Sequence, residues 1–288
     1  MREKLAHFGI ETELRIVKTS GDVFIDKPLH MISGWGVFVA EIDELMLAGQ
    51  IDLAVHSMKD LPTKRPEQLT ISAILKRDSP FDIMVSRDGS KFDGMNEGSV
   101  IGTSSMRRSA QIRRARQDLE VKSLRGNLQT RLRKLDQGDY DAIFLAEAGV
   151  QRMGIKMQYQ VLDLERFVPS ANQGTIVVVA RKDTEAELYS RSIDDMPTRI
   201  ETMIERKILE AVGGGCIVPM ATHAEVVDRK ARVLAEVLSL DGKRYVRINE
   251  VIEIEDGFTD KAYSLGRKLM EMGGEELVAE AVSAFGAR

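Results

Sequence analysis

The amino-acid sequence predicts an α/β protein with a small α+β domain at its C-terminal end. Between residues 37 and 180, short apolar segments typical of buried strands alternate with amphipathic helical segments, which is the pattern of an α/β fold. In residues 217–288, three strand patterns precede two helical ones, which favours a separate α+β domain there. With 288 residues, the chain has room for two or three domains with cores of their own.

Local patterns place the individual elements in order along the chain. Residues 1–8 are typical of the end of a helix, residues 12–18 alternate as a strand, and residues 19–36 are a long loop of the kind that often forms a lid. Further strands are expected at 51–55, 70–75 and 82–86, and another ends at Gly102. Others are expected at 121–124, 140–146, 175–180, 220–227, 232–240 and 244–253. Helices are expected at 37–48, after Ser105, at 128–137, 149–154 and 197–212, and twice after residue 253.

Basic charge is concentrated between Gly102 and Leu135. This stretch holds ten Lys and Arg against two acids, a local charge of +8, whereas the whole chain carries −4 and the remainder therefore −12. Ser105 is positioned as the N-cap of a helix whose first turn contains Arg107 and Arg108. Because arginines there oppose the helix dipole, an anion is the expected partner of this turn.

A second turn of the same kind follows, in which Arg125, Gly126 and Asn127 lead into a helix. Arginine forks bind carboxylates with two hydrogen bonds, and sites in open α/β sheets lie at the carboxyl ends of strands. The turn arginines are therefore favoured as binding residues for a molecule with several carboxylates or phosphates: Arg107, Arg108 and Arg125. The basic residues on the helices are favoured as a solvated face: Arg113, Arg114, Arg116, Arg133 and Lys134.

A second polar segment, HSMKDLP, follows directly after the apolar strand at 51–55. Its charged pair, Lys59 and Asp60, lies where active-site groups of α/β proteins are usually found. An adjacent lysine and aspartate is also a common surface ion pair. The pattern alone leaves both interpretations open.

The only cysteine, Cys216, follows three glycines that end a predicted helix. A free cysteine is most often buried and inert, but a glycine loop is a poor place for core packing. The C-terminal end of a helix raises the pKa of a thiol, which disfavours a turnover nucleophile at this position. A permanent covalent attachment point fits these observations better.

Composition narrows the class of protein. One cysteine excludes an internal disulfide and a cysteine-built metal site, and the four histidines show no metal spacing, so that no metal is expected. No apolar run approaches the length of a membrane span, and no secretory signal opens the sequence. These features predict a cytoplasmic location.

Four motifs, in this order, resemble those of the porphobilinogen deaminase (hydroxymethylbilane synthase) family. They are DLAVHSMKDLP at residues 52–62, GTSSMRR at 102–108, SLRGN at 123–127 and GGGCIVP at 213–219. The resemblance covers almost the whole chain. It implies two α/β domains similar to type II periplasmic binding proteins, with an active-site cleft between them, and a third, α+β domain that carries the cysteine. The implied boundaries are 1–77 with 174–195, then 78–173, then 196–288.

The resemblance also implies a reaction. A transferase of this family condenses four porphobilinogen molecules head to tail, with loss of ammonia each time, to the linear tetrapyrrole hydroxymethylbilane in heme, siroheme or corrinoid biosynthesis. The implied cofactor is a dipyrromethane that a thioether holds to Cys216. Each pyrrole carries an acetate and a propionate, which would account for clustered arginines in an acidic protein. Loss of ammonia leaves a cationic azafulvene-like species, so one carboxylate must stabilise that cation and handle the pyrrole protons.

Individual residues take implied roles from the positions that match the family motifs. Asp60 matches the catalytic aspartate, and Gly126 and Asn127 shape the turn that presents Arg125. The positions that match residues binding the cofactor or substrate are Ser57, Lys59, Thr103, Ser104, Ser105, Arg107, Arg108, Arg125, Arg131, Arg152 and Gln173. The implied partners are porphobilinogen and uroporphyrinogen-III synthase, which receives the product. A monomer that binds neither nucleic acid nor membrane is expected.

Three features depart from the family pattern. Family members begin with a strand of the type R-x-x-T-R-x-S-x-L-A, and Met1 falls inside the helix that follows it, so that this strand of the first domain is expected to be missing. The usual Gly-Lys-Gly of the lid is Gly34-Trp35-Gly36, and the usual Gly-Gln-Gly is Asn172-Gln173-Gly174.

Two other classes of function stay open. A non-catalytic anion-binding protein on the same two-lobed scaffold, a truncated relic of the enzyme, would keep the arginines without the chemistry. A nucleic-acid binder would use the basic stretch, although residues 102–135 contain no aromatic side chain and the whole chain is acidic, both of which count against it.

Overall fold

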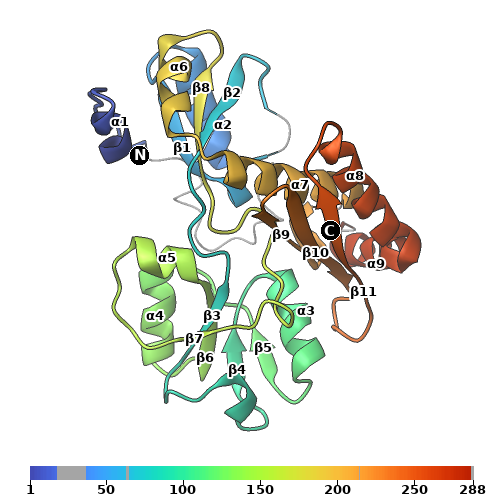
Figure 1. Ribbon diagram of the computed structural model, residues 1–288. Helices are drawn as coiled ribbons and strands as arrows, with labels where there is room; N and C mark the ends of the chain where they lie inside the picture. Colours follow the sequence, from blue (N-terminus) through green and yellow to red (C-terminus); the bar gives the residue numbers. More distant parts are fainter. Residues whose placement is uncertain (18–36, 63–64, 214, 287–288) are drawn as a thin grey trace. The chain divides into compact units, whose positions relative to one another are not determined.

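The computed structural model describes residues 1–17, 37–62, 65–213 and 215–286. The chain divides into two compact units (Figure 1). The first unit consists of Met1–Asp78 and Thr175–Thr202, and the second of Ser79–Gly174 and Met203–Arg288. The second unit contains two separate sheets. The division into three domains that was expected from the sequence stays a prediction.

The first unit is built on a three-stranded sheet in the order β1-β8-β2, in which the central strand runs antiparallel to both neighbours. Its elements are α1 (Arg2–His7), α2 (Val37–Leu47), β1 (Leu53–Ser57), η3 (Met58–Asp60), β2 (Leu69–Ile74), β8 (Ile176–Arg181), α6 (Glu185–Ser190) and η5 (Arg191–Ile193). Side chains of β8 alternate between two cores: Val177 and Val179 pack with Met46 of α2, and Val178 packs with Leu5 of α1. A strand buried on both faces reads as a continuous apolar run.

The strand predicted at 12–18 is wrong for residues 12–17, which form no regular structure. Leu14 and Ile16 are 63% and 81% exposed. No strand of the described residues pairs with this segment, so its backbone groups have no ladder to join and its alternating apolar residues have no face to cover. Residue 18 and the predicted loop at 19–36, with its Gly34-Trp35-Gly36, lie outside the described residues.

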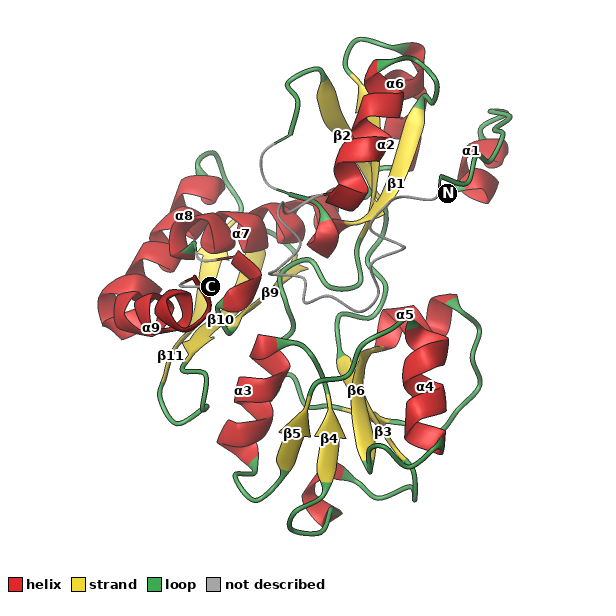
Figure 2. Cartoon of the chain, turned by 180° about the vertical axis from the view of Figure 1, so that it is seen from behind, coloured by secondary structure: helices red, strands yellow, loops and turns green. Residues whose placement is uncertain are grey.

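The second unit begins with a five-stranded sheet in the order β5-β4-β6-β3-β7. Strand β4 runs parallel to β5 and β6, whereas β3 runs antiparallel to β6 and β7. Its elements are β3 (Asp82–Ser86), η4 (Phe92–Gly94), β4 (Val100–Gly102), α3 (Met106–Ala115), β5 (Glu120–Lys122), α4 (Leu128–Asp136), β6 (Ala142–Ala146), α5 (Glu147–Arg152) and β7 (Gln160–Val161). Helix α3 covers one face, and α4 and α5 cover the other (Figures 1 and 2).

Alternation along β6 explains why both faces of this sheet are covered. Phe144 points to the core that contains Ile112 of α3, whereas Ile143 and Leu145 point to the core that contains Leu135 of α4. Successive side chains of a strand face opposite sides, so one apolar strand supplies both cores. The α/β fold predicted from alternating strands and helices is thereby confirmed.

The C-terminal part of the second unit is an antiparallel sheet in the order β11-β10-β9 with helices packed against it (Figure 1). Its elements are α7 (Met196–Val212), η6 (Gly215–Ile217), β9 (Met220–Val227), β10 (Lys230–Leu238), β11 (Tyr245–Glu253), α8 (Phe258–Leu269), η7 (Met270–Gly274) and α9 (Glu275–Gly286). Helix α8 crosses α7 closely at Gly266, where an added Cβ would lie 2.6 Å from the Cβ of Ala211. This arrangement confirms the predicted α+β domain.

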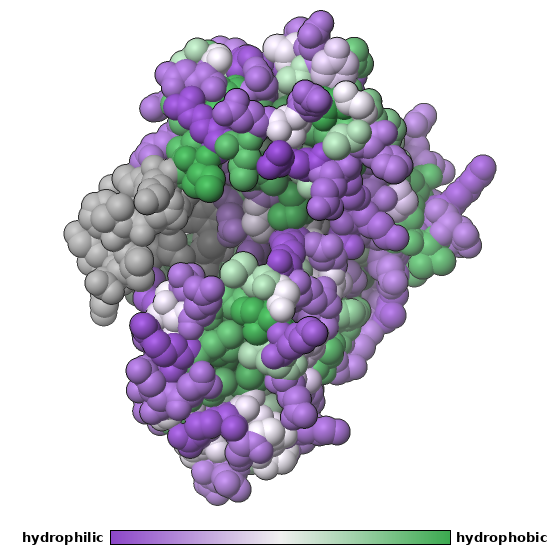
Figure 3. Space-filling model, turned by 90° about the vertical axis from the view of Figure 1, so that its left-hand side faces the viewer, coloured by the Kyte–Doolittle hydropathy of each residue, from purple (hydrophilic) through white to green (hydrophobic). Residues whose placement is uncertain are grey.

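The surface in view in Figure 3 is mostly hydrophilic, with apolar residues in smaller patches. None of the helices in the described part of the chain is long and apolar enough to cross a membrane.

Candidate active site

The turn between β4 and α3 is held by its own hydroxyl groups. Ser105 caps α3 as predicted, because its side chain accepts a hydrogen bond from the Arg108 backbone N–H. The Ser105 backbone N–H donates to Thr103 Oγ1 over 3.2 Å, and Ser104 Oγ donates to the Leu124 carbonyl over 2.8 Å. Gly102 is required before this turn, since a Cβ there would lie 2.8 Å from Tyr140 Cδ1. These contacts fix the start of α3, which carries the first two arginines.

Arg107 and Arg108 are only 5% and 6% exposed, and both bind the carboxylate of Asp82. Arg107 Nη1 lies 2.6 Å from Asp82 Oδ2, and Arg108 Nη2 lies 2.8 Å from Asp82 Oδ1. The anion expected at this turn is therefore supplied, in part, by the chain itself. Two guanidinium groups against one carboxylate leave the trio with a net charge of +1.

The pKa of Asp82 is lowered in spite of complete burial. Burial by itself would raise the pKa of this carboxyl, but the charges of Arg107 and Arg108 outweigh that effect, and hydrogen bonds from Arg107 and Gln173 add to it. Asp82 is therefore a carboxylate at neutral pH, and it orients both arginines.

Arg107 keeps one donor without a partner. Its Nη1 donates to Asp82, to the Val168 carbonyl over 2.7 Å and to Gln111 Oε1 over 3.2 Å. Its Nε is buried and has no hydrogen-bond partner among the described residues. A buried unpaired donor on a charged group costs free energy, so this nitrogen indicates a place for an acceptor that the protein does not provide.

Gln173 joins the same group of residues from the turn after Val168. Its Nε2 donates to Asp82 Oδ1 over 2.8 Å and to the Pro80 carbonyl over 2.7 Å. The preceding residue, Asn172, has a φ of 61°, and its backbone N–H donates to the buried carboxylate of Glu205 over 2.5 Å. The asparagine in place of the usual glycine thus adopts a left-handed conformation that asparagine tolerates better than most residues.

Arg152 also reaches this turn. Its Nη2 donates to the carbonyl of Gly174 over 2.7 Å, from the last turn of α5. Three of the predicted site residues are thus linked at the turn after Val168. Gln173 belongs to the turn, Arg152 donates to its Gly174 carbonyl, and Arg107 is joined to Gln173 through Asp82.

The second predicted turn lies at the start of α4. Asn127 caps the helix, with its Oδ1 2.9 Å from the backbone nitrogen of Thr130. Gly126 has a φ of +110°, and an added Cβ would lie 2.6 Å from Thr130 Cγ2, so that only glycine fits. Arg131 Nε donates to the Gly126 carbonyl over 2.8 Å. The turn and the helix therefore hold Arg125 and Arg131 on neighbouring backbone.

Arg108, Arg125 and Arg131 form a cationic cluster. Burial, and then the nearby charges of Arg108 and Arg125, lower the pKa of Arg131. No carboxylate of the described residues pairs with Arg131, whose side chain donates to a carbonyl. Like charges held together in this way raise the free energy of the unliganded protein, and a bound polyanion would relieve the repulsion.

The remaining predicted residues lie in the first unit, where β1 ends. Met58 is buried, its backbone N–H donates to the Thr175 carbonyl over 3.0 Å, and it anchors the short turn η3. Ser57 is half-buried, and Lys59 and Asp60 are exposed on this turn.

Strand β1 lies at the edge of the described three-stranded sheet, only its Ala54 is buried, and Val55 is 47% exposed. The expectation of a buried strand at 51–55 is therefore wrong in its burial, whereas the charged pair does follow directly after the strand, as predicted.

One residue beside this turn was not singled out from the sequence. The ring of His56 has a buried Nε2 without a hydrogen-bond partner among the described residues. Burial, and then the charge of Arg65, lower the pKa of His56 to about 4. This histidine is therefore neutral at physiological pH.

Cys216 lies in the short turn Gly215–Ile217 that follows α7. Gly213 and Gly215 have φ values of 71° and 64°, so that the glycines provide a sharp backbone bend after the helix. The side chain of Cys216 lies outside the described part of the chain, and its role as an attachment point stays a prediction.

The solvated basic face predicted on α3 is wrong for three arginines. Arg113 donates to the Leu240 carbonyl over 2.8 Å, Arg114 binds the buried carboxylate of Glu236, and Arg116 binds Asp118 and nearby carbonyls. Helix α3 lies against the C-terminal hairpin, and Arg113 and Arg114 bind it, whereas Arg116 binds residues near its own helix and sheet. The pattern of basic residues carried no sign of this neighbour, because it follows more than 100 residues later in the sequence. Arg133, by contrast, is exposed as predicted.

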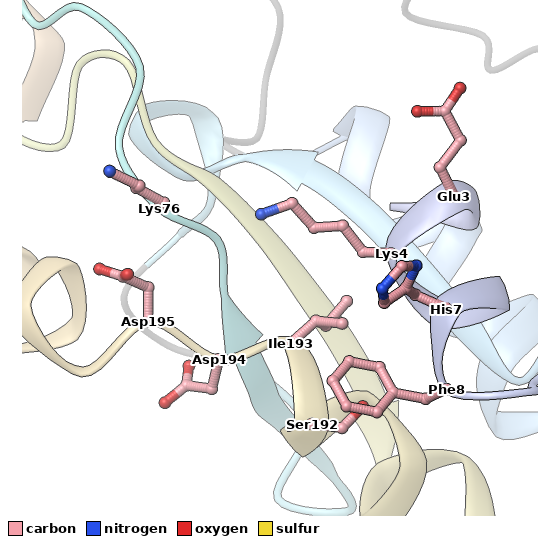
Figure 4. A pocket seen from close by; sticks show the side chains of 9 residues that line it. All are labelled: Glu3, Lys4, His7, Phe8, Lys76, Ser192, Ile193, Asp194 and Asp195. Atoms are coloured by element: carbon pink, nitrogen blue, oxygen red, sulfur yellow. The ribbon is translucent and has the colours of Figure 1, made fainter.

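A surface pocket of about 450 Å³ lies elsewhere in the first unit (Figure 4). It is lined by Glu3, Lys4, His7, Phe8, Lys76, Ser192, Ile193, Asp194 and Asp195. None of these is a predicted site residue, so the pocket forms no part of the candidate active site.

Two family models match the chain. One, described as porphobilinogen deaminase, dipyromethane cofactor binding domain, matches residues 1–190, and the other, described as porphobilinogen deaminase, C-terminal domain, matches residues 199–272.

Proteins that are named as porphobilinogen deaminases match almost the whole chain. A probable porphobilinogen deaminase from Methanococcoides burtonii is 52% identical over 95% of this chain and 89% of the relative. A porphobilinogen deaminase from Syntrophobacter fumaroxidans is 40% identical over 94% of this chain and 88% of the relative. A solved periplasmic sulfonate-binding protein from Methylobacillus flagellatus is 15% identical over 71% of this chain and 63% of that protein, with a TM-score of 0.37, which is too low to carry an argument. The matches to both family models and the identity to these relatives show that the chain belongs to the porphobilinogen deaminase family.

Proposed function

We propose that this chain condenses four molecules of porphobilinogen, with loss of ammonia, into hydroxymethylbilane, and that it does so as a transferase. The observation that carries the proposal is the cationic cluster of Arg108, Arg125 and Arg131, in which the turn before α4 positions Arg131, and burial, followed by the two neighbouring charges, lowers its pKa. A product that gains two carboxylates with each added pyrrole needs such a surface. The family to which the chain belongs supports the same reaction.

The described residues fit a dipyrromethane cofactor. The group would bring several carboxylates, and the trio of Asp82, Arg107 and Arg108 keeps a net charge of +1 after its internal pairing. The buried Nε of Arg107 lacks an acceptor among the described residues. When bound, the group supplies the pyrrole carbon to which each substrate is added. We assign its attachment to Cys216, and its carboxylates to Arg107, Arg108, Arg125 and Arg131.

We assign the catalytic role among the chain's own residues to Asp60, supported by its neighbours. An exposed carboxylate on a rigid turn can accept a hydrogen bond from a pyrrole N–H and hold positive charge as ammonia leaves. Lys59 would bind a substrate carboxylate beside it, and Ser57 would orient the turn. Ser104 and Thr103 would hold the turn at the start of α3, where the helix dipole favours an anion.

Three further expectations from the sequence, on the next enzyme, the oligomeric state and the location, belong to this proposal. We propose that the product passes to uroporphyrinogen-III synthase, that the enzyme acts as a monomer, and that it works in the cytoplasm. The reading as a nucleic-acid binder loses support, because Arg113, Arg114 and Arg116 are engaged within the chain.

The direct test is to measure the mass of the intact purified protein and its product. We expect a mass above that of the bare chain by one dipyrromethane, a positive Ehrlich reaction, and hydroxymethylbilane formation from porphobilinogen. Bare mass without product, but with retained binding of porphobilinogen, would instead select the non-catalytic anion-binding protein.

Arg131 offers a prediction with a distinctive signature. Replacing it with glutamine is expected to raise the KM for porphobilinogen roughly tenfold, because a hydrogen bond to a charged group is lost. The same change should alter the stability of the unliganded protein only slightly, since the loss of the hydrogen bond to the Gly126 carbonyl is offset by relief of the repulsion from Arg108 and Arg125. Steady-state kinetics and thermal unfolding measure the two effects.

The matched control for this prediction is Arg133→Gln, on the same helix but exposed. It should leave KM unchanged. An equal rise in KM in both variants would mean that only the overall charge of α4 matters, and the assigned role of Arg131 would be lost.

A further inference from the structure

A buried acid in the C-terminal sheet lies at the centre of a second polar cluster. Glu236 of β10 is fully buried, and its carboxylate accepts hydrogen bonds from one helix, α3, and one strand, β11. Arg114 Nη1 of α3 lies 2.7 Å from Oε2, Arg247 Nε of β11 lies 2.8 Å from Oε2, and Gln111 Nε2 of α3 lies 2.8 Å from Oε1. A buried carboxylate with this many donors is held in one position.

Gln111 connects this cluster to Arg107. Its Nε2 donates to Glu236 and, over 2.9 Å, to the Val168 carbonyl, while its Oε1 accepts from Arg107 Nη1 over 3.2 Å. Since a carboxylate and a carbonyl can only accept, both amide hydrogens of Gln111 are committed to them. The amide oxygen is therefore forced to face Arg107.

The hairpin that carries Glu236 lies directly on α3. At its turn, an added Cβ on Gly242 would lie 2.3 Å from the Ala110 carbonyl oxygen and 2.7 Å from the Arg114 nitrogen. Arg113 donates to the Leu240 carbonyl beside the same turn. These contacts lie in the second half of α3, between Ala110 and Arg114, so the hairpin fixes the position of that part of the helix.

We propose that Glu236 is a positioning residue for the anion-binding site, and that it acts through the amide of Gln111 on the guanidinium of Arg107. Arg107 Nη1 has two hydrogens for three acceptors, Asp82, Val168 and Gln111, so the Gln111 oxygen shares one of them, and Nε remains the buried donor without a partner among the described residues. The Gln111 oxygen that Glu236 fixes thus helps to hold the guanidinium in the orientation in which Nε is the donor left for a ligand. The inference rests on the proposed function, in that Arg107 binds a carboxylate of the substrate or cofactor.

The experiment compares Glu236→Gln, Gln111→Leu and the double variant. A neutral glutamine at 236 can donate to Gln111, so that the Gln111 amide is free to turn its NH2 group toward Arg107. Gln111→Leu removes the link but keeps the ion pairs of Glu236 with Arg114 and Arg247. Each single variant should raise KM for porphobilinogen roughly tenfold with kcat within about twofold. The double variant should be no worse than either single one, because both act through one contact.

A structural role alone predicts a different pattern. In that case both variants would melt at lower temperature while KM stayed at the parent value, or their effects on KM would add, and either outcome would overturn the proposal. Measurements are made at a temperature at which circular dichroism shows every variant folded. The control is Arg244→Gln, whose exposed pairs with Glu276 and Glu280 belong to the same hairpin but do not reach α3; its KM should be that of the parent.

A calorimetric titration separates this inference from the proposed function. Porphobilinogen is added to protein carrying Asp60→Asn, which suppresses turnover, with and without the Glu236→Gln or Gln111→Leu change, and the heat of binding is recorded. In this comparison the parent is the protein with Asp60→Asn alone. No binding by the parent would count against the proposed function. Binding by the parent and equally tight binding by Glu236→Gln and Gln111→Leu would leave the function intact and remove the role of Glu236.

Discussion

Cys216→Ser protein is expected to have the mass of the bare chain and to form no hydroxymethylbilane. A thioether needs the sulfur, and a serine hydroxyl is a far weaker nucleophile than a thiolate. The glycines around position 216 bend the backbone immediately after α7 and leave the residue in a short turn. An attachment point on such a turn can carry a bulky group that a packed core position could not. Intact-protein mass and a porphobilinogen consumption assay measure the two effects.

Asp60→Asn is the matched control, because it should separate loading from turnover. The variant keeps the thiol and the arginines, so a mass increment is expected. Its kcat should fall by roughly 10²–10⁴, the usual contribution of a positioned acid or base. If Cys216→Ser protein made product at the parent rate, the tether would not exist. If Asp60→Asn kept the parent kcat, its charge would be a surface feature only.

Much of the fold could be predicted because its central strands, such as β8 and β6, are covered on both faces. The run Val177, Val178 and Val179 is apolar throughout, and the structure shows why: two helices, α1 and α2, pack on opposite sides of the strand that contains it. Segment 12–17 shows where the prediction of strands from a local sequence pattern fails. Its alternation of polar and apolar residues is as clear as that of a true strand, but pairing depends on a neighbouring strand, which a local pattern cannot reveal.

The residues of the candidate site could be proposed from the sequence motifs, but the residues that orient them could not. The motifs pointed to Arg107 and Arg108, yet the carboxylate that orients them, Asp82, opens the strand DIMVS and resembles an ordinary loop residue at a strand start. Glu236 gave a faint signal, as an acid inside the otherwise apolar end of β10. A charged residue at a core position requires a partner, but the identity of that partner, Arg114, depends on how a hairpin packs on a helix far away in the sequence.

Asp82→Asn is expected to destabilise the second unit by about 3–5 kcal/mol at neutral pH, the usual effect of removing one partner from a buried ion pair. The amide keeps some hydrogen bonds, but Arg107 and Arg108 would then face each other without a balancing charge. Binding of porphobilinogen should weaken as well, since neither guanidinium stays oriented. Urea unfolding followed by circular dichroism gives the change in stability.

The pH dependence of stability provides an independent check with a definite sign. The pKa of Asp82 is lower in the folded protein than in the unfolded chain, where it is about 3.9. The stabilisation is therefore complete above the unfolded pKa and is lost as the pH falls below about 4 toward the folded pKa. The gap between parent and Asp82→Asn should be constant from pH 7 to pH 5 and should narrow toward pH 3. Asp93→Asn, which breaks an exposed pair with Arg166, should show little change at any pH. A gap that stayed constant down to pH 3 would mean that the carboxylate charge is not what holds the two arginines.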